Sequence, residues 1–112
     1  MSHNAERLAS FLGREVTEFL LRHAVMPEGA FFSVSRVLLD NALDKAQVFI
    51  LIFPDKLAHE SFTEIKHSER EVRKYIASRL KRHKIPHIKF VLDTTQTKQV
   101  RLEKLLENIE NN

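Results

Sequence analysis

Apolar residues at the start of the chain recur at helical spacing. Between residues 5 and 23 they fall three and four positions apart, with charged residues between them, which predicts an amphipathic helix. Asn4 is suited to cap its start, and Pro27 and Gly29 mark the loop that follows. The residues of the apolar stripe are Leu8, Leu12, Val16, Phe19, Leu20 and His23.

Two strands are predicted after that loop. Residues 31–39 are rich in β-branched and aromatic side chains, but the apolar face switches midway, and a β-bulge near Ser35 and Arg36 explains the switch. Residues 46–53 are apolar on both faces, so this strand should be central in its sheet and largely covered. A turn at residues 40–44 joins the two strands as an antiparallel hairpin.

A long helical pattern follows, over residues 56–83. Its apolar stripe lacks a step at Ser68 or Glu69. Unbroken, the helix would be about 42 Å long at about 1.5 Å per residue, which is long for so small a domain, so a kink or a break is expected. Ile85 and Pro86 should end the helix, because proline disfavours helical backbone in the preceding residue.

The remainder of the chain predicts one more strand and one more helix. The strand covers residues 87–92, and the helix runs from about 96 to 109. The element order is then α-β-β-α-α-β-α, in which the long pattern counts as two helices if it breaks. Because the chain has 112 residues and no linker, we expect one α+β domain over residues 1–112, with helices covering a three-stranded sheet.

Composition excludes several classes of protein. The chain has no cysteine, which excludes disulfides and cysteine nucleophiles. Its longest apolar run, Val48 to Phe53, is far shorter than the roughly 20 residues of a membrane span. We therefore expect a cytoplasmic protein without a membrane segment.

Catalytic and metal-binding patterns are not evident either. The chain shows no nucleophile elbow and no phosphate-binding glycine loop. Pro86 separates His83 from His87, while His59 and His67 lack an obvious acidic third ligand on their helix face. We therefore expect no catalytic residue, no metal site and no cofactor.

Positive charge is concentrated in one segment. The formal net charge of the chain is +3, but residues 66–84 alone contribute +6, because eight Lys and Arg residues there meet two glutamates. At about 100° per residue, Arg70, Lys74 and Lys81 point away from the apolar stripe. Together with their neighbours they form a surface that we call the basic face. Its residues are Lys66, Arg70, Arg73, Lys74, Lys81, Arg82 and Lys84.

The basic face suits the phosphate backbone of RNA. Each phosphate that Lys or Arg neutralises releases counterions, which makes binding favourable and dependent on salt. Tyr75, the one aromatic residue in the segment, is expected to pack at the flank of the helix, with base stacking as the alternative. Two other interpretations stay open. The cations merely solvate the helix, or a protein partner binds the C-terminal helix or an apolar outer face of the sheet formed by Phe31, Phe49, Leu51 and Phe53.

Five ordered segments resemble one known family. No single segment is a sharp signature, but the set matches in order, spacing and total length. The segments are Ala5-Glu6-Arg7-Leu8 through Arg14-Glu15-Val16; Phe32-Ser33-Val34-Ser35-Arg36-Val37; Ala42-Leu43-Asp44-Lys45-Ala46-Gln47-Val48-Phe49; Ile85-Pro86-His87-Ile88-Lys89-Phe90-Val91-Leu92-Asp93; and Val100-Arg101-Leu102-Glu103-Lys104-Leu105-Leu106. Along nearly its whole length, the chain resembles ribosome-binding factor A.

The resemblance implies a type II KH fold in which an Ala-x-Gly kink between two helices replaces the usual glycine loop. In this chain the kink would fall on Ser68, Glu69 and Arg70. Arg70 stands where the family has glycine, and positive φ is disfavoured for any other residue. A kink at these residues, a different bend and an unbroken helix therefore all stay open.

For function, the resemblance implies a ribosome maturation factor and not an enzyme. Such a protein binds the immature 30S subunit and 16S ribosomal RNA, assists late assembly and 5′-end processing of the precursor, and is needed most in the cold. It has no small-molecule substrate, and we expect a monomer off the ribosome. The alternative is a generic basic KH-like RNA-binding or protein-interaction module without a role in ribosome assembly.

Overall fold

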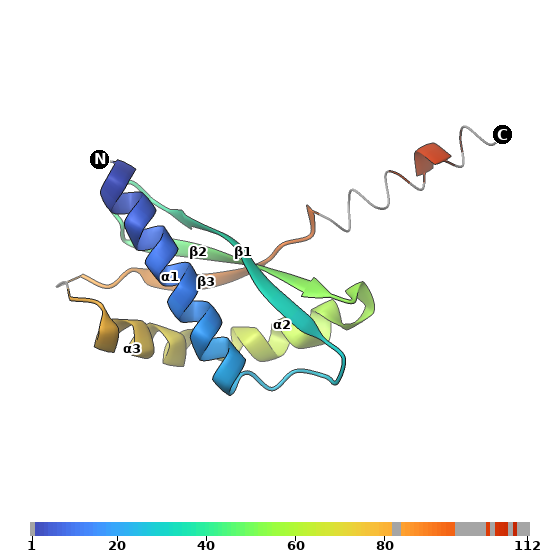
Figure 1. The fold of residues 1–112 in the computed structure, drawn as a ribbon, viewed down its shortest axis with the longest axis horizontal. Helices are drawn as coiled ribbons and strands as arrows, with labels where there is room; N and C mark the ends of the chain where they lie inside the picture. The colour runs from blue at the N-terminus through green and yellow to red at the C-terminus, as the bar shows by residue number, and fades with distance from the viewer. Residues whose placement is uncertain (1, 82–83, 96–102, 104, 108, 110–112) are drawn as a thin grey trace.

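Three helices cover one face of a three-stranded sheet (Figure 1). The computed structural model describes residues 2–81, 84–95, 103, 105–107 and 109. In chain order the elements are α1 (Ser2–His23), β1 (Phe31–Leu39), β2 (Lys45–Phe53), the 3-10 turn η1 (Asp55–Leu57), α2 (Ala58–Lys66), α3 (Glu69–Arg79) and β3 (His87–Leu92). The expected α+β class and the order α-β-β-α-α-β are confirmed.

The sheet has β2 at its centre, as its apolar pattern predicted. β2 pairs antiparallel with β1 and parallel with β3. The register between β1 and β2 shifts between Val34 and Arg36, so the predicted bulge at Ser35 is confirmed. In a regular strand Val34 and Val37 would point to opposite faces. Because the bulge adds one residue between them, both point to the same face and pack against the core.

The core lies between the sheet and the helices. α1 contributes a buried stripe at the predicted spacing, although Phe19 is only half-buried and His23, which was expected in the stripe, is exposed; β2 contributes alternate residues that are buried. The largest side chain buried in this layer is Phe90 of β3. The buried apolar residues are Leu8, Leu12, Val16, Leu20, Ala46, Val48, Ile50, Ile52, Ala58, Ile65, Val72, Ile76, Ile88 and Phe90.

The long helical pattern is broken into two helices. α2 ends at Lys66 and α3 begins at Glu69, so the break is at His67 and Ser68; it begins one residue before the expected kink and overlaps it at Ser68. His67 has φ −62° and Ser68 has φ −89°, both ordinary negative values. Because the chain turns here without positive φ, it needs no glycine, and Arg70 is accommodated inside α3.

Two expectations about helix ends were wrong. α1 begins at Ser2, so Asn4 lies inside the helix and does not cap it. α3 ends at Arg79 and not near residue 83, because Leu80 takes extended backbone with φ −97° and ψ 119°. Leu80 still packs against the core from that extended position, which is why the apolar pattern continued through it.

Most of the expected final helix, residues 96–109, lies outside the described residues. Within the part of the chain that the structure describes, no helix is both long and apolar enough to cross a membrane.

Candidate nucleic-acid interface

α1 and α3 lie side by side and run in opposite directions. Phe19 of α1 packs its ring 5.3 Å from the ring of Tyr75 on α3, and one turn earlier on α1 the carboxylate of Glu15 pairs with Arg79. Glu15 is a buried residue, so this ion pair ties the two helices together at the edge of the core. The two helices therefore present one continuous surface with side chains from both.

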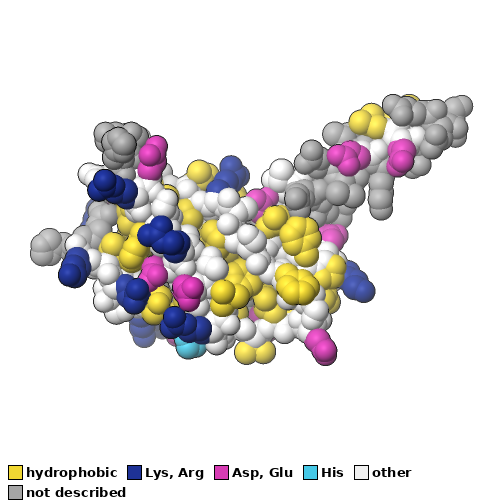
Figure 2. All heavy atoms as spheres, in the orientation of Figure 1, with side chains coloured by type: hydrophobic (Ala, Val, Ile, Leu, Met, Phe, Trp, Pro, Cys, Tyr) yellow, Lys and Arg dark blue, Asp and Glu magenta, His cyan; other side chains and the backbone are white. Residues whose placement is uncertain are grey.

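Three cations of the basic face point into solvent from this surface. Arg70 and Lys74 lie on the side of α3 opposite the buried Val72, and Lys81 follows the end of the helix. All three are exposed, and none has an acidic partner among the described residues. Figure 2 shows Lys and Arg side chains gathered over α1 and α3. Unpaired cations in this arrangement attract anions.

Arg73 has a different role, although it belongs to the same sequence segment. It is half-buried, and its guanidinium donates to the carbonyl oxygen of Ile85 at 3.0 Å and to that of Pro86 at 3.3 Å. These bonds hold α3 against the segment that leads into β3. Arg73 is therefore already bonded within the fold.

Two lysines of the basic face also have partners. Lys66 pairs with Glu69 at 3.4 Å across the break between α2 and α3, and Lys84 pairs with Asp44 at the end of the β1–β2 turn. Both lysines remain exposed, so these weak ion pairs make them less available to bind an anionic partner but do not prevent such binding. Arg82, the last member of the basic face, lies outside the described residues.

Glu69, expected as a kink residue, closes the edge of the sheet. β3 is an edge strand, and the N–H of its buried Phe90 donates to the Glu69 carboxylate at 2.6 Å. A single carboxylate thus pairs with Lys66 and satisfies a strand donor that β2 does not reach. The break between the helices places Glu69 where it can make both contacts.

Tyr75 packs at the helix flank, as predicted. Its ring is half-buried against Phe19, and the Arg79 guanidinium lies 5.6 Å from the ring centroid. The hydrogen bond to Glu15 raises the pKa of Arg79 above its usual value. Arg79 is thus engaged with α1.

Sequence reasoning missed two cations that α1 adds to this surface. Arg7 and Arg14 are exposed, and neither has an acidic partner among the described residues. They are seven positions apart, a spacing that puts both on one side of a helix. Their spacing is visible in the sequence, but only the packing of α1 along α3 adds the two arginines to the basic surface.

The outer face of the sheet exposes aromatic side chains at one end and charged side chains such as Lys45 and Lys89 toward the other, and among the described residues no helix covers it. Phe31 of β1 stands opposite Phe53 of β2, and the two residues are 69% and 45% exposed. Arg36 lies 4.1 Å from the ring centroid of Phe49 on the same face. This surface differs in chemistry from the α1–α3 side and is a separate candidate for contact.

A metal centre finds no support in this arrangement. Within the described ranges, no three His, Asp or Glu side chains come together in a way that would hold a metal ion.

The fold and this surface define a class: a small α+β domain in which two adjacent helices present exposed cations. Comparison with known proteins gives the family within that class. The family model described as ribosome-binding factor A matches residues 4–106. A ribosome-binding factor A of Halothermothrix orenii is 30% identical over 106 residues, which cover 94% of this chain and 87% of that protein. This chain belongs to the ribosome-binding factor A family.

Solved structures agree with the fold. A Thermotoga maritima protein described as a ribosome binding factor A matches with a TM-score of 0.65 and 24% identity, over 77% of this chain and 83% of that chain. A model of Thermus thermophilus ribosome binding factor A, fitted into a cryo-electron microscopy map of its complex with the 30S subunit, matches with a TM-score of 0.59 and 18% identity, over 77% and 91% of the two chains. At these identities the likeness concerns the fold.

Proposed function

We propose that this protein binds the 30S ribosomal subunit and that the outer side of α3 contacts 16S ribosomal RNA. The observation that carries the proposal is the row of exposed cations at Arg70, Lys74 and Lys81, which have no acidic partner among the described residues. Lysine and arginine in such a row neutralise successive phosphates and release their counterions. Lys66, Lys84 and Arg82 extend the proposed contact.

Membership of the family supports the choice of ribosomal RNA over other nucleic acids. The Thermus thermophilus relative is described in a complex with the 30S subunit, and its fold matches this chain. By the same resemblance, the proposed role is late assembly of the immature subunit and 5′-end processing of the 16S precursor, with the greatest need in the cold. The proposed place of action is the cytoplasm, as a monomer when off the ribosome.

The proposed role is a binding role, without catalysis or a cofactor. Specificity would come from the shape of folded RNA, because the proposed contacts reach phosphates and carry no base readout. This distinguishes the protein from a processing nuclease: it would favour a conformation of the precursor that other factors act on.

Sedimentation with purified ribosomal particles over a series of salt concentrations tests the proposal. The protein should sediment with 30S subunits and not with 70S ribosomes. The logarithm of its association constant should fall linearly with the logarithm of the salt concentration, with a slope of roughly −1 for each phosphate contact. Equal association with both particles, or association that salt leaves unchanged, would reject a specific electrostatic contact with the small subunit.

The apolar end of the sheet's outer face favours a second candidate, a contact with a protein. Phe31 and Phe53 expose large rings side by side on neighbouring strands. Exposed apolar patches of this kind mark interaction sites. The double variant Phe31→Ser and Phe53→Ser would lower 30S association if a ribosomal protein covers this face, and would leave it unchanged if RNA contacts at α3 suffice.

A further inference from the structure

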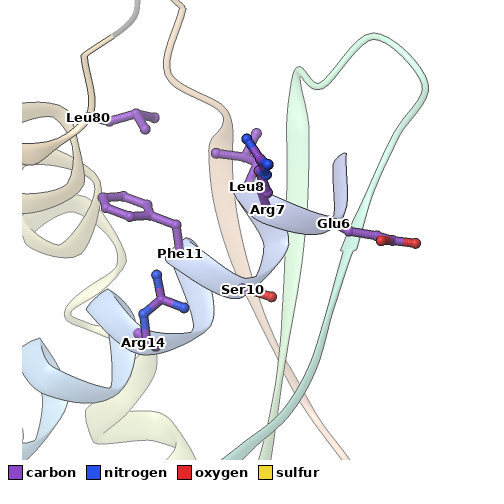
Figure 3. Close-up of a pocket in the computed structure, with 7 residues that line it drawn as sticks. All are labelled: Glu6, Arg7, Leu8, Ser10, Phe11, Arg14 and Leu80. Atoms are coloured by element: carbon purple, nitrogen blue, oxygen red, sulfur yellow. The ribbon is translucent and has the colours of Figure 1, made fainter. Parts of the chain in front are cut away.

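Three side chains of α1 form a stripe beside the basic face. Arg7, Phe11 and Arg14 stand at positions i, i+4 and i+7, which share one side of a helix. All three line a hollow between α1 and the chain that leaves α3 at Leu80. In Figure 3, Phe11 and Leu80 point toward each other, and the two arginines project on either side of Phe11 along the helix. The stripe therefore combines an aromatic ring with two flanking cations.

The hollow is broad and open to solvent. Its volume is about 640 Å³, within the roughly 300–1,000 Å³ of ligand sites. A site for a small molecule usually encloses its ligand, and this hollow does not. Its openness suits one unit of a polymer whose chain continues beyond the site on both sides.

Electrostatics in the hollow favour an anionic polymer. Arg7 and Arg14 have no acidic partner among the described residues, and the exposed Lys81 directly follows Leu80 in the chain. Glu6 also lines the hollow, but Figure 3 shows its side chain directed away from Phe11 and Leu80. Guanidinium groups bind phosphate oxygens with paired hydrogen bonds, so two of them, one on each side of a ring, match two phosphates that flank a base.

The core positions the side chain of Phe11. Its ring is half-buried and packs against the core, as does Leu80 across the hollow. A ring that the protein has already immobilised loses little freedom when a base lies on it. Aromatic residues beside cations are the usual means by which proteins hold unpaired bases without reading their identity.

We propose that this hollow holds one unpaired nucleotide of RNA, with the base against Phe11 and the flanking phosphates against Arg7 and Arg14. The inference rests on the proposed function and adds a preference to it. The cations of α3 bind any RNA backbone, whereas a base reaches Phe11 only where it is unstacked and unpaired. The site therefore directs the protein to single-stranded segments beside a duplex.

Fluorescence anisotropy with the full chain tests this site, using a short single-stranded oligoadenylate and an RNA duplex of equal length as probes. Phe11→Leu removes the ring and keeps an apolar side chain in the lining of the hollow. It should weaken binding of the single strand by about tenfold, equivalent to about 1.4 kcal/mol, and leave binding of the duplex unchanged. Phe19→Leu, which removes an aromatic residue from the same helix outside the hollow, should weaken neither.

A second variant keeps the test valid if Phe11→Leu unfolds the protein. Arg7→Gln with Arg14→Gln changes two exposed side chains and should lower single-strand affinity more than duplex affinity. Its control is Arg22→Gln, which removes an exposed arginine that pairs with Glu18 on α1.

The proposal is overturned if the folded Phe11→Leu protein, or the double arginine variant, binds both probes as the unaltered protein does, or loses both equally. Its failure is distinct from failure of the proposed function. Protein that sediments with 30S subunits but shows no single-strand effect rejects the hollow alone, whereas protein that does not sediment with 30S subunits rejects the proposed function.

Discussion

The basic segment has two sides with different roles. On the side that faces β3, Arg73 donates to two carbonyl oxygens, and Lys66 pairs with Glu69. On the side that faces solvent, Arg70 and Lys74 have no acidic partner among the described residues. Residues one position apart in sequence, Arg73 and Lys74, therefore belong to different parts of the protein's chemistry: the first stabilises the fold, and the second is available for a partner.

This difference shows why charge counts overstate a binding surface. A cation already bonded to the protein gains less from a phosphate, because it must give up its existing bonds. The residues best placed to bind RNA are those for which the fold supplies no acceptor.

Replacing Arg73 should have the largest effect on stability. Arg73→Met removes both hydrogen bonds to the carbonyls of Ile85 and Pro86, and should lower the free energy of unfolding by about 3 kcal/mol. Lys74→Met, at the neighbouring exposed position, should change it by less than about 0.5 kcal/mol. Urea unfolding followed by circular dichroism measures both. Equal stability of the two variants would contradict the assignment of Arg73 to the fold and of Lys74 to a binding partner.

Glu69 should be next in effect. Glu69→Ala leaves the buried N–H of Phe90 without an acceptor and should cost about 2 kcal/mol, whereas Glu69→Gln keeps an acceptor oxygen and should cost less. Glu71→Ala is the matched control, because it removes a second carboxylate from the first turn of α3 and so includes the effect of the helix dipole. If both alanine variants unfold at the same urea concentration, the contact with Phe90 contributes nothing.

The smallest expected effect concerns Asp93, which directly follows β3. The Ser35 hydroxyl donates to the Asp93 carboxylate at 2.6 Å, and this bond, with others from Thr95, lowers the pKa of Asp93 below its usual 3.8. The folded state favours the ionised form of Asp93. The contribution of this carboxylate to stability is therefore complete above pH 3.8, the unfolded-state pKa, and is lost as pH falls through the lower pKa of the folded state. Asp93→Asn should therefore flatten the acid decline of thermal stability below about pH 4. An unchanged decline would contradict this assignment.

The strands were predictable from local chemistry. Residues 31–39 and 87–92 form strands at the predicted positions, because β-branched and aromatic residues mark the first and Pro86 precedes the second. The bulge at Ser35 was also readable, since an apolar pattern that changes face within one strand requires an extra residue.

The helical segment was less predictable, because apolar spacing reports which side chains are buried and not which backbone carries them. Leu80 packs against the core from extended backbone, so the pattern suggested a helix longer than α3. The break at His67 and Ser68 uses ordinary negative φ values, so no glycine announces it. Local sequence did not indicate the hydrogen-bond acceptors of Arg73, because the carbonyl oxygens of Ile85 and Pro86 lie on a segment that tertiary packing brings to α3.

The same limit applies to the candidate site. The exposure of Arg70 and Lys74 followed from the angle of each residue around the helix, whereas Lys81, also exposed as predicted, lies beyond the end of α3, where that angle does not apply. The addition of Arg7 and Arg14 did not, because it depends on the antiparallel packing of α1 along α3. A surface built from one helix is thus visible in the sequence, and a surface shared by two helices needs the fold.

Charge reversal on the solvent side of α3 tests the central claim most directly. Lys74→Glu with Lys81→Glu should weaken 30S association by about a hundredfold, at about 1.4 kcal/mol for each position, without unfolding the protein. The matched control is Lys45→Glu with Lys89→Glu, an equal change in charge at exposed positions of the sheet. Loss of association in the first variant and its retention in the control is the predicted result. Unchanged association of the α3 variant, or equal loss in both, would contradict the assignment of RNA binding to this surface.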